Sequence, residues 1–360
     1  MNTSTFPVKF GVCGLGRIGM QHSRVFSEDR KRYQPVAFCD IDAQRARDIA
    51  RKFGGKPFSD FAEFLARPEM ELVIIATRSL DHARHAGQAL AAGKIVLLEK
   101  PVGVTAADFE LLKRLDKAYP GKLFFGHNHR FEPAFQNTLA IVASGILGKI
   151  HVAKFSKSHG FLRRNDWQMR LDCGGGQLFV WAPHLLDQTL QLIGVPTRDV
   201  WSSLRRVLTS GDADDHLRIM LTGASGISGE IEISNIVAQD GSYCVLYGDR
   251  GTLTYGQDQK QIRLRYLHPE FQWTAAAANA ETPQPGQRWN SDPLLPWVEE
   301  TRPVEPEGNM WEQVEVEIAR HLHSALRLGI PFPVKNADAL EVVRITEIVK
   351  KQNPQFSWLG

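Results

Sequence analysis

The sequence has few cysteines, no long apolar run and little net charge, and each shortage excludes a class of protein. Four scattered cysteines among 360 residues, with no CxxC pair, argue against a disulfide scaffold and against a zinc site. We therefore expect no metal. No apolar stretch reaches the roughly 20 residues that a membrane helix needs, so we expect no membrane partner.

Charge and composition narrow the possibilities further. A formal net charge of +3 is too small to indicate binding to nucleic acid. The first strand-like run starts at Val8, which leaves no room for a signal peptide. Hydrophobic residues at 43% and charged residues at 23% are ordinary for a globular protein. We expect a cytoplasmic protein, and its length predicts two domains.

Short apolar runs alternate with helical patterns over the first part of the chain. The runs are Val8–Cys13, Val36–Cys39, Leu72–Ala76, Ile95–Leu98 and Leu123–Gly126, and helical patterns such as Ala43–Phe53 and His82–Ala92 lie between them. Strands that are apolar at successive positions and alternate with helices predict a parallel sheet covered on both faces. We assign this α/β domain to residues 1–124.

The rhythm changes in residues 125–360, which we assign to a second domain. Strand patterns with short turns between Val200 and Tyr255 predict a mostly antiparallel sheet. The triple glycine 174–176 opens a helix that is predicted to reach about Ile193. The stretch His268–Asn309 has no clear period and is interpreted as a surface excursion. Two helices, Trp311–Leu328 and Ala337–Gln352, end the chain, and the last is left open to pack back on the first domain.

A glycine-rich turn follows the first strand. The run Gly14-Leu-Gly16-Arg17-Ile18-Gly19 is a GxGxxG that opens a helix, and Asp40 ends the next strand. This context is typical of a dinucleotide-binding Rossmann unit. Gly14 allows the tight turn, Gly16 lets the backbone approach the pyrophosphate, and Gly19 lets helix and strand pack closely. The helix N-terminus then offers free N–H groups to the phosphates.

Asp40 bears on which dinucleotide binds. A carboxylate at this position accepts hydrogen bonds from the ribose hydroxyls of NAD and repels the 2′-phosphate of NADP. Arg45 and Arg47 lie close in the sequence, but helical arginines of this kind are usually solvated. The sequence therefore predicts NAD, with NADP as the less favoured alternative.

Further motifs follow in a fixed order along the chain. They are Ala76-Thr77, His82, Glu99-Lys100-Pro101, Asn128-His-Arg130-Phe131-Glu-Pro133, the triple glycine with His184 and Asp187, and Gly329-Ile-Pro331. With the GxGxxG, this series resembles the Gfo/Idh/MocA family, which includes glucose–fructose oxidoreductase and inositol dehydrogenases, over nearly the whole chain. The resemblance implies a Rossmann domain followed by an α/β domain for substrate binding and oligomerisation. Its large, mostly antiparallel open sheet would make a homodimer or homotetramer.

The resemblance also implies residue roles. Lys100 would lie beside the nicotinamide and the reacting hydroxyl, and His184 would transfer a proton or hold the same hydroxyl. Asp187, on the same helical face, would bind a substrate hydroxyl or orient His184. The residues expected to contact the cofactor are Gly14, Gly16, Arg17, Ile18, Gly19, Asp40, Thr77, His82, Glu99, Lys100 and Asn128.

One position departs from the family pattern. Many sugar dehydrogenases of the family carry an aspartate four residues before the histidine, and this chain has Val180 there. Valine cannot orient an imidazole, so either Lys100 is the main base or another carboxylate replaces the missing one. The neighbouring Trp181 packs in the core or against a sugar ring.

A polar loop from Ser158 to Gln168 precedes the triple glycine. It is interpreted either as a solvated loop or as a wall over the nicotinamide, with Trp167 against cofactor or substrate. Arg163 or Arg164 would then recognise a carboxylate, sulfonate or phosphate, and the sequence leaves open which one faces inward. The substrate-binding residues predicted in total are Lys100, Arg163, Arg164, Trp167, Trp181, His184 and Asp187.

These inferences predict an NAD-dependent oxidoreductase acting on a small carbohydrate or polyol. Hydride would pass between a secondary alcohol of a sugar, polyol or glycoside and nicotinamide, with Lys100 and His184 managing the proton. Two alternatives stay open. One is a redox-assisted glycoside-cleaving enzyme that uses transient oxidation and elimination, and the other is a non-catalytic NAD-binding sensor.

Overall fold

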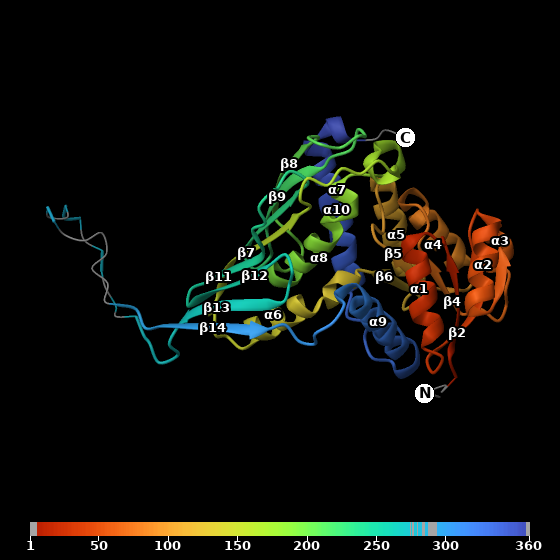
Figure 1. The fold of residues 1–360 in the computed structure, drawn as a ribbon, viewed down its shortest axis with the longest axis horizontal. Helices are drawn as coiled ribbons and strands as arrows, with labels where there is room; N and C mark the ends of the chain where they lie inside the picture. The colour runs from red at the N-terminus through yellow and green to blue at the C-terminus, as the bar shows by residue number, and fades with distance from the viewer. Residues whose placement is uncertain are drawn as a thin grey trace.

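The computed structural model describes residues 6–273, 275, 277–278, 280–282, 285–286 and 294–357. The signal-peptide argument rests partly on residues 1–5, which lie outside this set. Two sheets with helices between them make up the molecule (Figure 1). Among the described residues, no helix is both long and apolar enough to cross a membrane.

The first sheet has six parallel strands in the order β3-β2-β1-β4-β5-β6. The strands are β1 (Val8–Cys13), β2 (Tyr33–Cys39), β3 (Lys56–Phe58), β4 (Leu72–Ile75), β5 (Ile95–Glu99) and β6 (Leu123–Gly126). The accompanying helices are α1 (Arg17–Glu28), α2 (Ala43–Phe53), α3 (Phe61–Leu65), α4 (His82–Ala91) and α5 (Ala106–Ala118). The predicted parallel sheet is confirmed. Its order reverses between β1 and β4, which is where such sheets bind ligands.

The second sheet has eight strands in the order β14-β13-β12-β11-β7-β10-β9-β8. They are β7 (Ile150–Ser158), β8 (Asp199–Arg205), β9 (His216–Thr222), β10 (Ser228–Ser234), β11 (Ser242–Gly248), β12 (Gly251–Gly256), β13 (Gln261–Leu267) and β14 (Trp297–Pro303). Only β7 and β10 pair in parallel, so the mostly antiparallel sheet is also confirmed. In β9, buried Leu217, Ile219 and Leu221 alternate with more exposed residues. One face of the sheet is therefore apolar and covered.

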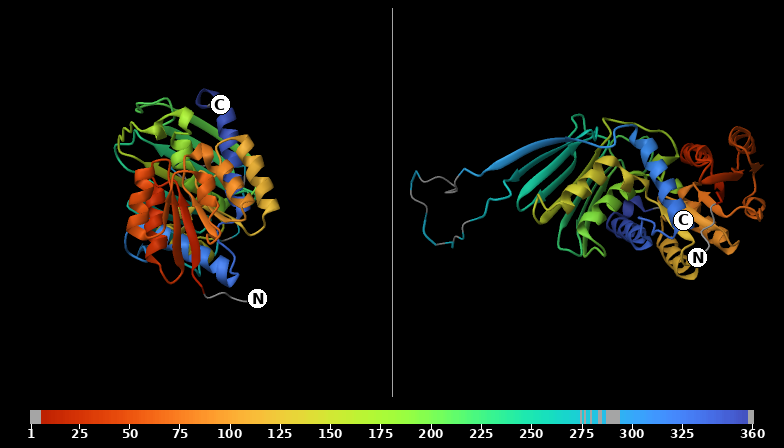
Figure 2. Two further views of the ribbon diagram at one scale, coloured as in Figure 1. Left: turned by 90° about the vertical axis from the view of Figure 1, so that its right-hand side faces the viewer. Right: turned by 90° about the horizontal axis from the view of Figure 1, so that it is seen from below.

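Helices cover that face, and the other face is open (Figure 2). The covering helices are α6 (Pro133–Ala143), α7 (Gln177–Val180), α8 (Ala182–Ile193) and α10 (Asn336–Gln352). The single helix predicted up to Ile193 is wrong in one respect, because the chain breaks at Trp181 between α7 and α8.

The predicted surface excursion His268–Asn309 is wrong over Trp297–Pro303. This segment is the edge strand β14. It pairs with β13, from Trp297 opposite Leu267 to Pro303 opposite Gln261. Every residue of β14 keeps some exposure, so its sequence carries no apolar stripe. The pairing with β13 defines the strand, and parts of the remaining excursion lie outside the described residues.

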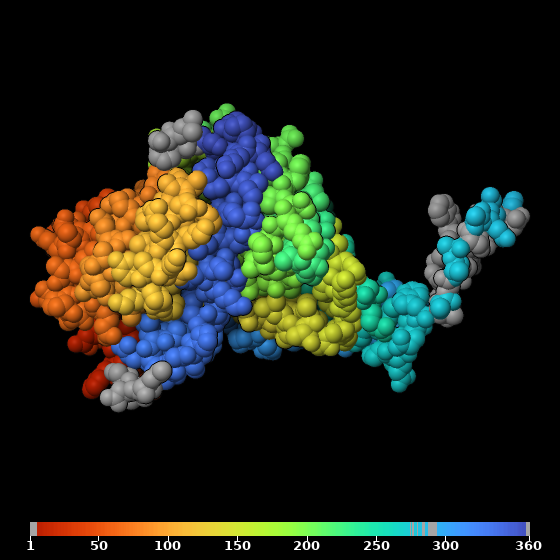
Figure 3. Space-filling view, turned by 180° about the vertical axis from the view of Figure 1, so that it is seen from behind, coloured from red at the N-terminus to blue at the C-terminus, as the bar shows by residue number. Residues whose placement is uncertain are grey.

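The two C-terminal helices join the two halves of the molecule. Val314, Ile318 and Leu322 of α9 (Met310–His323) belong to the core of the first sheet. In α10, Val343 enters the first core and Val342 enters the second. Figure 3 shows α10 in dark blue, between the N-terminal half in orange and the second domain in green. The final helix thus packs against both sheets.

Candidate functional site

The glycine loop after β1 shapes the first part of the site. Gly14 has a φ of +85°, and an added Cβ would lie 2.5 Å from the Ala76 carbonyl oxygen. At Gly19 a Cβ would lie 1.7 Å from the Gly14 oxygen, so α1 and the loop touch there. At Gly16 a Cβ would meet nothing within 4 Å. Gly16 therefore faces open space at the start of α1, as an approaching pyrophosphate requires.

Asp40 follows β2 and closes the same loop. Its Oδ2 accepts the Leu15 N–H at 2.7 Å, and its Oδ1 accepts Arg45 Nη1 at 3.1 Å. Arg45 is exposed, as expected from the sequence, but it is also paired with Asp40, whereas Arg47 bonds Gln44 on the helix surface. The guanidinium of Arg45 offsets part of the negative charge that would repel a 2′-phosphate.

Lys100 stands at the carboxyl end of β5. Its Nζ donates a hydrogen bond to the Val180 carbonyl oxygen at 3.1 Å. Residue 180 therefore contacts Lys100 through its backbone, although its valine side chain cannot form a hydrogen bond. Burial lowers the pKa of Lys100 to about 8; the carboxylate of Glu99 opposes this shift and the charge of Arg17 adds to it. A lysine with this pKa can accept a proton near neutral pH.

A buried polar network lies behind Lys100. The His22 ring lies 2.7 Å from Glu99 Oε1 and 3.1 Å from Glu315 Oε2, and Asn128 donates to Glu315 at 2.7 Å. Burial alone would lower the pKa of His22, but the charges of Glu315 and Glu99 raise it to about 9. Glu99 and Asn128, predicted as cofactor contacts, have exposures of only 3% and 5% and bond protein groups instead.

His82 contacts the loops that follow β4 and β5, at Thr77 and Pro101. The His82 ring nitrogens lie 2.8 Å from the Pro101 oxygen and 3.2 Å from the Thr77 oxygen. His82 is 2% exposed, so it positions the two loops and does not line a channel as predicted. The Thr77 hydroxyl lies 3.1 Å from His85 Nδ1 and is partly exposed.

His184 lies in α8, buried against a second histidine. Its ring stacks on His129 with centroids 3.7 Å apart, and its Nδ1 has no partner within the described residues. His129 Nδ1 lies 2.5 Å from Glu132 Oε1, and the other Glu132 oxygen accepts Gln188 Nε2 at 2.8 Å. Burial holds the pKa of His184 well below its usual value, and the charges of His129 and Lys100 lower it further. The Glu132 carboxylate therefore contacts the histidine on which His184 stacks, and not His184 itself.

The role predicted for Asp187 is wrong in both forms. Its two carboxylate oxygens accept hydrogen bonds from Arg130, one from Nε at 2.9 Å and one from Nη2. Asp187 has 0% exposure, so it can neither touch a substrate hydroxyl nor orient His184. Arg130 also bonds the Pro333 carbonyl and Asp338 of α10. Asp187 therefore fixes α8 to the C-terminal segment.

The polar loop separates its two arginines. Arg163 is exposed and donates to the Leu208 carbonyl at 2.9 Å, whereas Arg164 is partly buried and pairs with Asp166 at 2.5 Å. The Arg164 charge is felt inside the site, where it adds to the lowering of the Lys100 pKa. Trp167 packs on the Arg78 guanidinium, 4.2 Å from ring centroid to carbon, and so brings the loop against the first domain.

Trp181 is the centre of an aromatic and cationic cluster. Its ring lies 5.6 Å from those of His159 and His184 and 5.9 Å from that of Trp311, centroid to centroid. Lys157 Nζ lies 4.9 Å from the same centroid. Sequence reasoning missed Lys157 and Trp311, because residues from β7 and α9 join the cluster only through the fold, whereas His159 belongs to the polar loop that the sequence had already singled out. Aromatic faces beside cations and imidazoles suit a polyhydroxylated ring.

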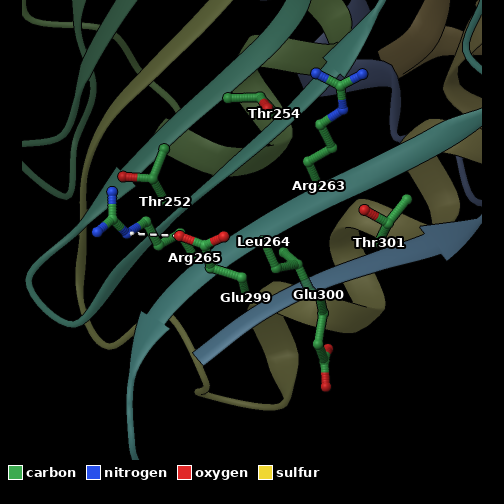
Figure 4. A pocket seen from close by; sticks show the side chains of 8 residues that line it. All are labelled: Thr252, Thr254, Arg263, Leu264, Arg265, Glu299, Glu300 and Thr301. Atoms are coloured by element: carbon green, nitrogen blue, oxygen red, sulfur yellow. Dashed lines mark ion pairs between the residues drawn. The ribbon is translucent and has the colours of Figure 1, made fainter. Parts of the chain in front are cut away.

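A second hollow lies away from these groups, on the open face of the second sheet (Figure 4). Its volume is about 520 Å³. The lining residues are Thr252, Thr254, Arg263, Leu264, Arg265, Glu299, Glu300 and Thr301. Arg265 and Glu299 form an ion pair across it at 3.3 Å. None of the predicted site residues lines this hollow, so it is separate from the candidate active site.

Both halves of the chain are similar to known proteins. Residues 8–127 match the model of the oxidoreductase family with an NAD-binding Rossmann fold. Residues 135–254 match the C-terminal domain of the Gfo/Idh/MocA family. The solved structure of levoglucosan dehydrogenase in complex with NADH aligns with a TM-score of 0.79 at 19% identity, covering 98% of each chain. That likeness concerns the fold.

Two relatives illustrate the sequence similarity. A 1-carboxy-3-chloro-3,4-dihydroxycyclohexa-1,5-diene dehydrogenase of Comamonas testosteroni is 33% identical over 202 residues, 55% of this chain. The chain spans only 51% of that protein's length. An inositol 2-dehydrogenase of Acidothermus cellulolyticus is 26% identical over 266 residues, which are 71% of this chain and 75% of the relative. From its two matched domains and its fold, the chain belongs to the Gfo/Idh/MocA family of oxidoreductases with an NAD-binding Rossmann fold.

Proposed function

We propose that the protein is an NAD-dependent oxidoreductase acting on a secondary alcohol of a sugar, polyol or glycoside. The proposal rests on one observation above all. Lys100 Nζ lies 3.1 Å from the Val180 carbonyl, at the head of the helix pair that carries His184, and its pKa is lowered to about 8. Alcohol oxidation needs a base with a pKa near neutrality, a neutral group that can hold the hydroxyl, and a cofactor site beside them. Lys100, His184 and the glycine loop fit these three requirements.

The chain's own residues fit the dinucleotide. The space in front of Gly16 would take the pyrophosphate at the first N–H groups of α1, and Asp40 would bind the ribose hydroxyls. NAD is the proposed cofactor because the carboxylate of Asp40 would face the ribose, although Arg45 moderates its effect. When bound, the nicotinamide supplies the hydride acceptor or donor.

Lys100 would accept the proton of the substrate hydroxyl, and His184 would hold that hydroxyl in place. In oxidation, the neutral amine of Lys100 takes the hydroxyl proton, and the Val180 carbonyl then holds the ammonium that forms. His184 is kept neutral by burial and by the neighbouring positive charges, so it can hold the same hydroxyl. Trp181 and Trp311 would pack against the apolar face of the substrate ring.

The substrate class draws support from the relatives. An inositol and an anhydrosugar are named for two of them, and the Comamonas relative is named for a carboxylated ring diol. Assembly as a homodimer or homotetramer would use the open face of the second sheet. Trp201, Met220 and Tyr247 expose 52%, 43% and 43% of their surfaces on it. Apolar side chains on a sheet face favour contact with a second copy.

A substrate screen tests the proposed function. Sugars, polyols, sugar acids and glycosides are incubated with NAD while NADH absorbance and products are followed. Accumulation of NADH with a ketone product is the expected result. Glycoside cleavage without net NADH would instead establish the elimination reaction. NAD binding without turnover, unchanged by loss of Lys100 or His184, would establish a sensor.

A further inference from the structure

Lys157 has an unusual environment for a lysine. It lies near the end of β7, is half-buried, and holds its Nζ 4.9 Å from the Trp181 centroid and 5.8 Å from the Tyr243 centroid. Across the described ranges, no aspartate or glutamate forms an ion pair with it. Burial lowers the pKa of Lys157, and the more distant Glu132 and Asp240 only oppose that shift. The ammonium is thus held by aromatic rings without a counter-ion.

The groups around Lys157 do not supply the missing counter-ion. The ring of His159 also packs on Trp181, and its Nε2 is buried with no hydrogen-bond partner in the described part of the chain. Burial and the charges of Lys157 and Arg164 lower the pKa of His159 to about 4. The nearby carboxylate of Glu132 is occupied by His129 and Gln188. The Lys157 ammonium therefore has no partner of opposite charge within the described residues.

Trp181 connects Lys157 and His159 to the proposed reacting groups. Its ring lies 5.6 Å from the ring of His184, and the preceding carbonyl, that of Val180, accepts the Lys100 Nζ. A small ring lying on the indole would therefore reach both Lys100 and Lys157. A negatively charged substituent would satisfy the half-buried ammonium better than a hydroxyl, because a charge-assisted hydrogen bond is about twice as strong as a neutral one.

We propose that Lys157 binds a carboxylate on the substrate, so that sugar acids or cyclic polyol acids are preferred to neutral sugars. This inference rests on the proposed alcohol oxidation and names the substrate class of the same site. It assigns the anion contact to a residue of β7, whereas the sequence placed it in the polar loop.

Matched pairs of substrates test the inference. Oxidation of D-glucuronate and D-galacturonate is compared with that of D-glucose and D-galactose, and wild type should prefer the acids. Lys157→Met keeps an apolar stem without the charge. It should lower kcat/KM for the acids roughly 10- to 100-fold more than for the neutral sugars, mainly through KM. Lys157→Arg, which keeps the charge, should retain most of the preference.

The strand offers a matched control. Lys154 also lies on β7 with its Nζ over an aromatic ring, 5.3 Å from the Tyr247 centroid. Unlike Lys157, it is ion-paired, to Glu230 at 3.1 Å. Lys154→Met should leave the preference for acids unchanged. Equal losses for acids and neutral sugars in Lys157→Met, or a wild-type preference for neutral sugars, would overturn the inference.

A binding measurement separates this inference from the proposed function. Calorimetric titration with D-glucuronate in the presence of NADH should give binding to wild type that Lys157→Met loses. Binding of this kind without any NADH formation from NAD would refute the oxidation but uphold the anion site. NADH formation that is indifferent to both the carboxylate and Lys157 would uphold the oxidation and refute the anion site.

Discussion

The rings of His129 and His184 stack with their centroids 3.7 Å apart and their planes at 36°. Glu132 has no exposed surface, and its Oε1 lies 2.5 Å from His129 Nδ1. Glu132 thus holds the ring on which His184 stacks, while Val180 stands at the family's aspartate position. Burial keeps the pKa of His184 low, and the charge of His129 lowers it further.

Removing that charge should shift the pH dependence of the reaction. In His129→Asn the pKa of His184 rises, so more of the ring is protonated at a given pH. The acid limb of kcat/KM should then move to higher pH, with little change in rate on the plateau above it. A pH–rate profile of NADH formation checks this. His151→Asn, an exposed histidine of β7, is the control, and an unmoved acid limb would contradict the prediction.

Lys100 should govern the alkaline side of the profile. Because its pKa is lowered to about 8, the neutral amine becomes dominant only above that pH, so oxidation should rise with pH and level off beyond it. Lys100→Ala should abolish hydride transfer with NAD binding intact. Lys100→Arg should be nearly inactive, because arginine holds its proton. His184→Ala should lose less, about 10²–10⁴-fold.

Single-turnover measurement of NADH appearance separates chemistry from product release. If Lys100→Ala keeps most of its rate while His184→Ala is inert, the two roles are exchanged. His184 would then be the base, served by Glu132 through His129.

Cofactor choice should respond in opposite directions at Asp40 and Arg45. Asp40→Ser removes the proposed ribose acceptor and should weaken NAD binding by about 1–2 kcal/mol. Arg45→Ala removes the cation paired with Asp40, so this variant should bind NADP more weakly than wild type does. Fluorescence titration with both dinucleotides measures these effects. Tighter binding of NADP than of NAD by wild type would show the assignment of Asp40 to be wrong.

Two glycines of one loop should separate binding from folding. Gly16 has ordinary backbone angles and open space at its Cβ position, so Gly16→Ala should change the free energy of unfolding by about 0.5 kcal/mol or less and impair NAD binding. Gly19→Ala would bring a methyl group onto the Gly14 oxygen and should destabilise the protein by about 3 kcal/mol. Denaturant unfolding and NAD titration distinguish the two. Normal NAD affinity in Gly16→Ala would contradict the proposed pyrophosphate site.

Asp187→Asn should be a stability variant. It leaves the buried Arg130 guanidinium without its main counter-ion, and breaking such a pair typically costs about 3–5 kcal/mol. The control is Asp172→Asn, which loses an exposed pair with Arg170 and should leave the urea midpoint nearly unchanged. Urea unfolding measures both. Full stability of Asp187→Asn together with lost activity would restore a catalytic role for Asp187.

Five of the six strands of the first sheet were predictable because their signals are local, whereas the short and partly exposed β3 was missed. Strands such as Leu72–Ile75 are apolar at every position, and the glycine loop and Asp40 lie within one strand–helix–strand unit. The edge strand β14 escaped prediction because all of its residues remain partly exposed, and only pairing with β13 makes it a strand.

Side-chain partners across the fold were beyond sequence reasoning. Glu315 reaches His22 across almost the entire chain, and no spacing rule connects α9 with α1. Asp187 looked catalytic from its distance to His184, but Arg130 engages both of its oxygens. Glu132 stood in a recognised motif, yet its partner His129 and their place beside His184 depend on how that segment meets α8.

The helix α9 completes the core of the first sheet, and this has a consequence for synthesis on the ribosome. The Tyr33 hydroxyl donates to the Ala319 carbonyl, and Val314, Ile318 and Leu322 seal apolar side chains of the first domain. A nascent chain that has emerged only to residue 127 still lacks this cover. At about 5–20 residues per second, it waits roughly 10–40 s for α9 to be made. The apolar surface left bare in that interval is where a chaperone should engage the newborn protein.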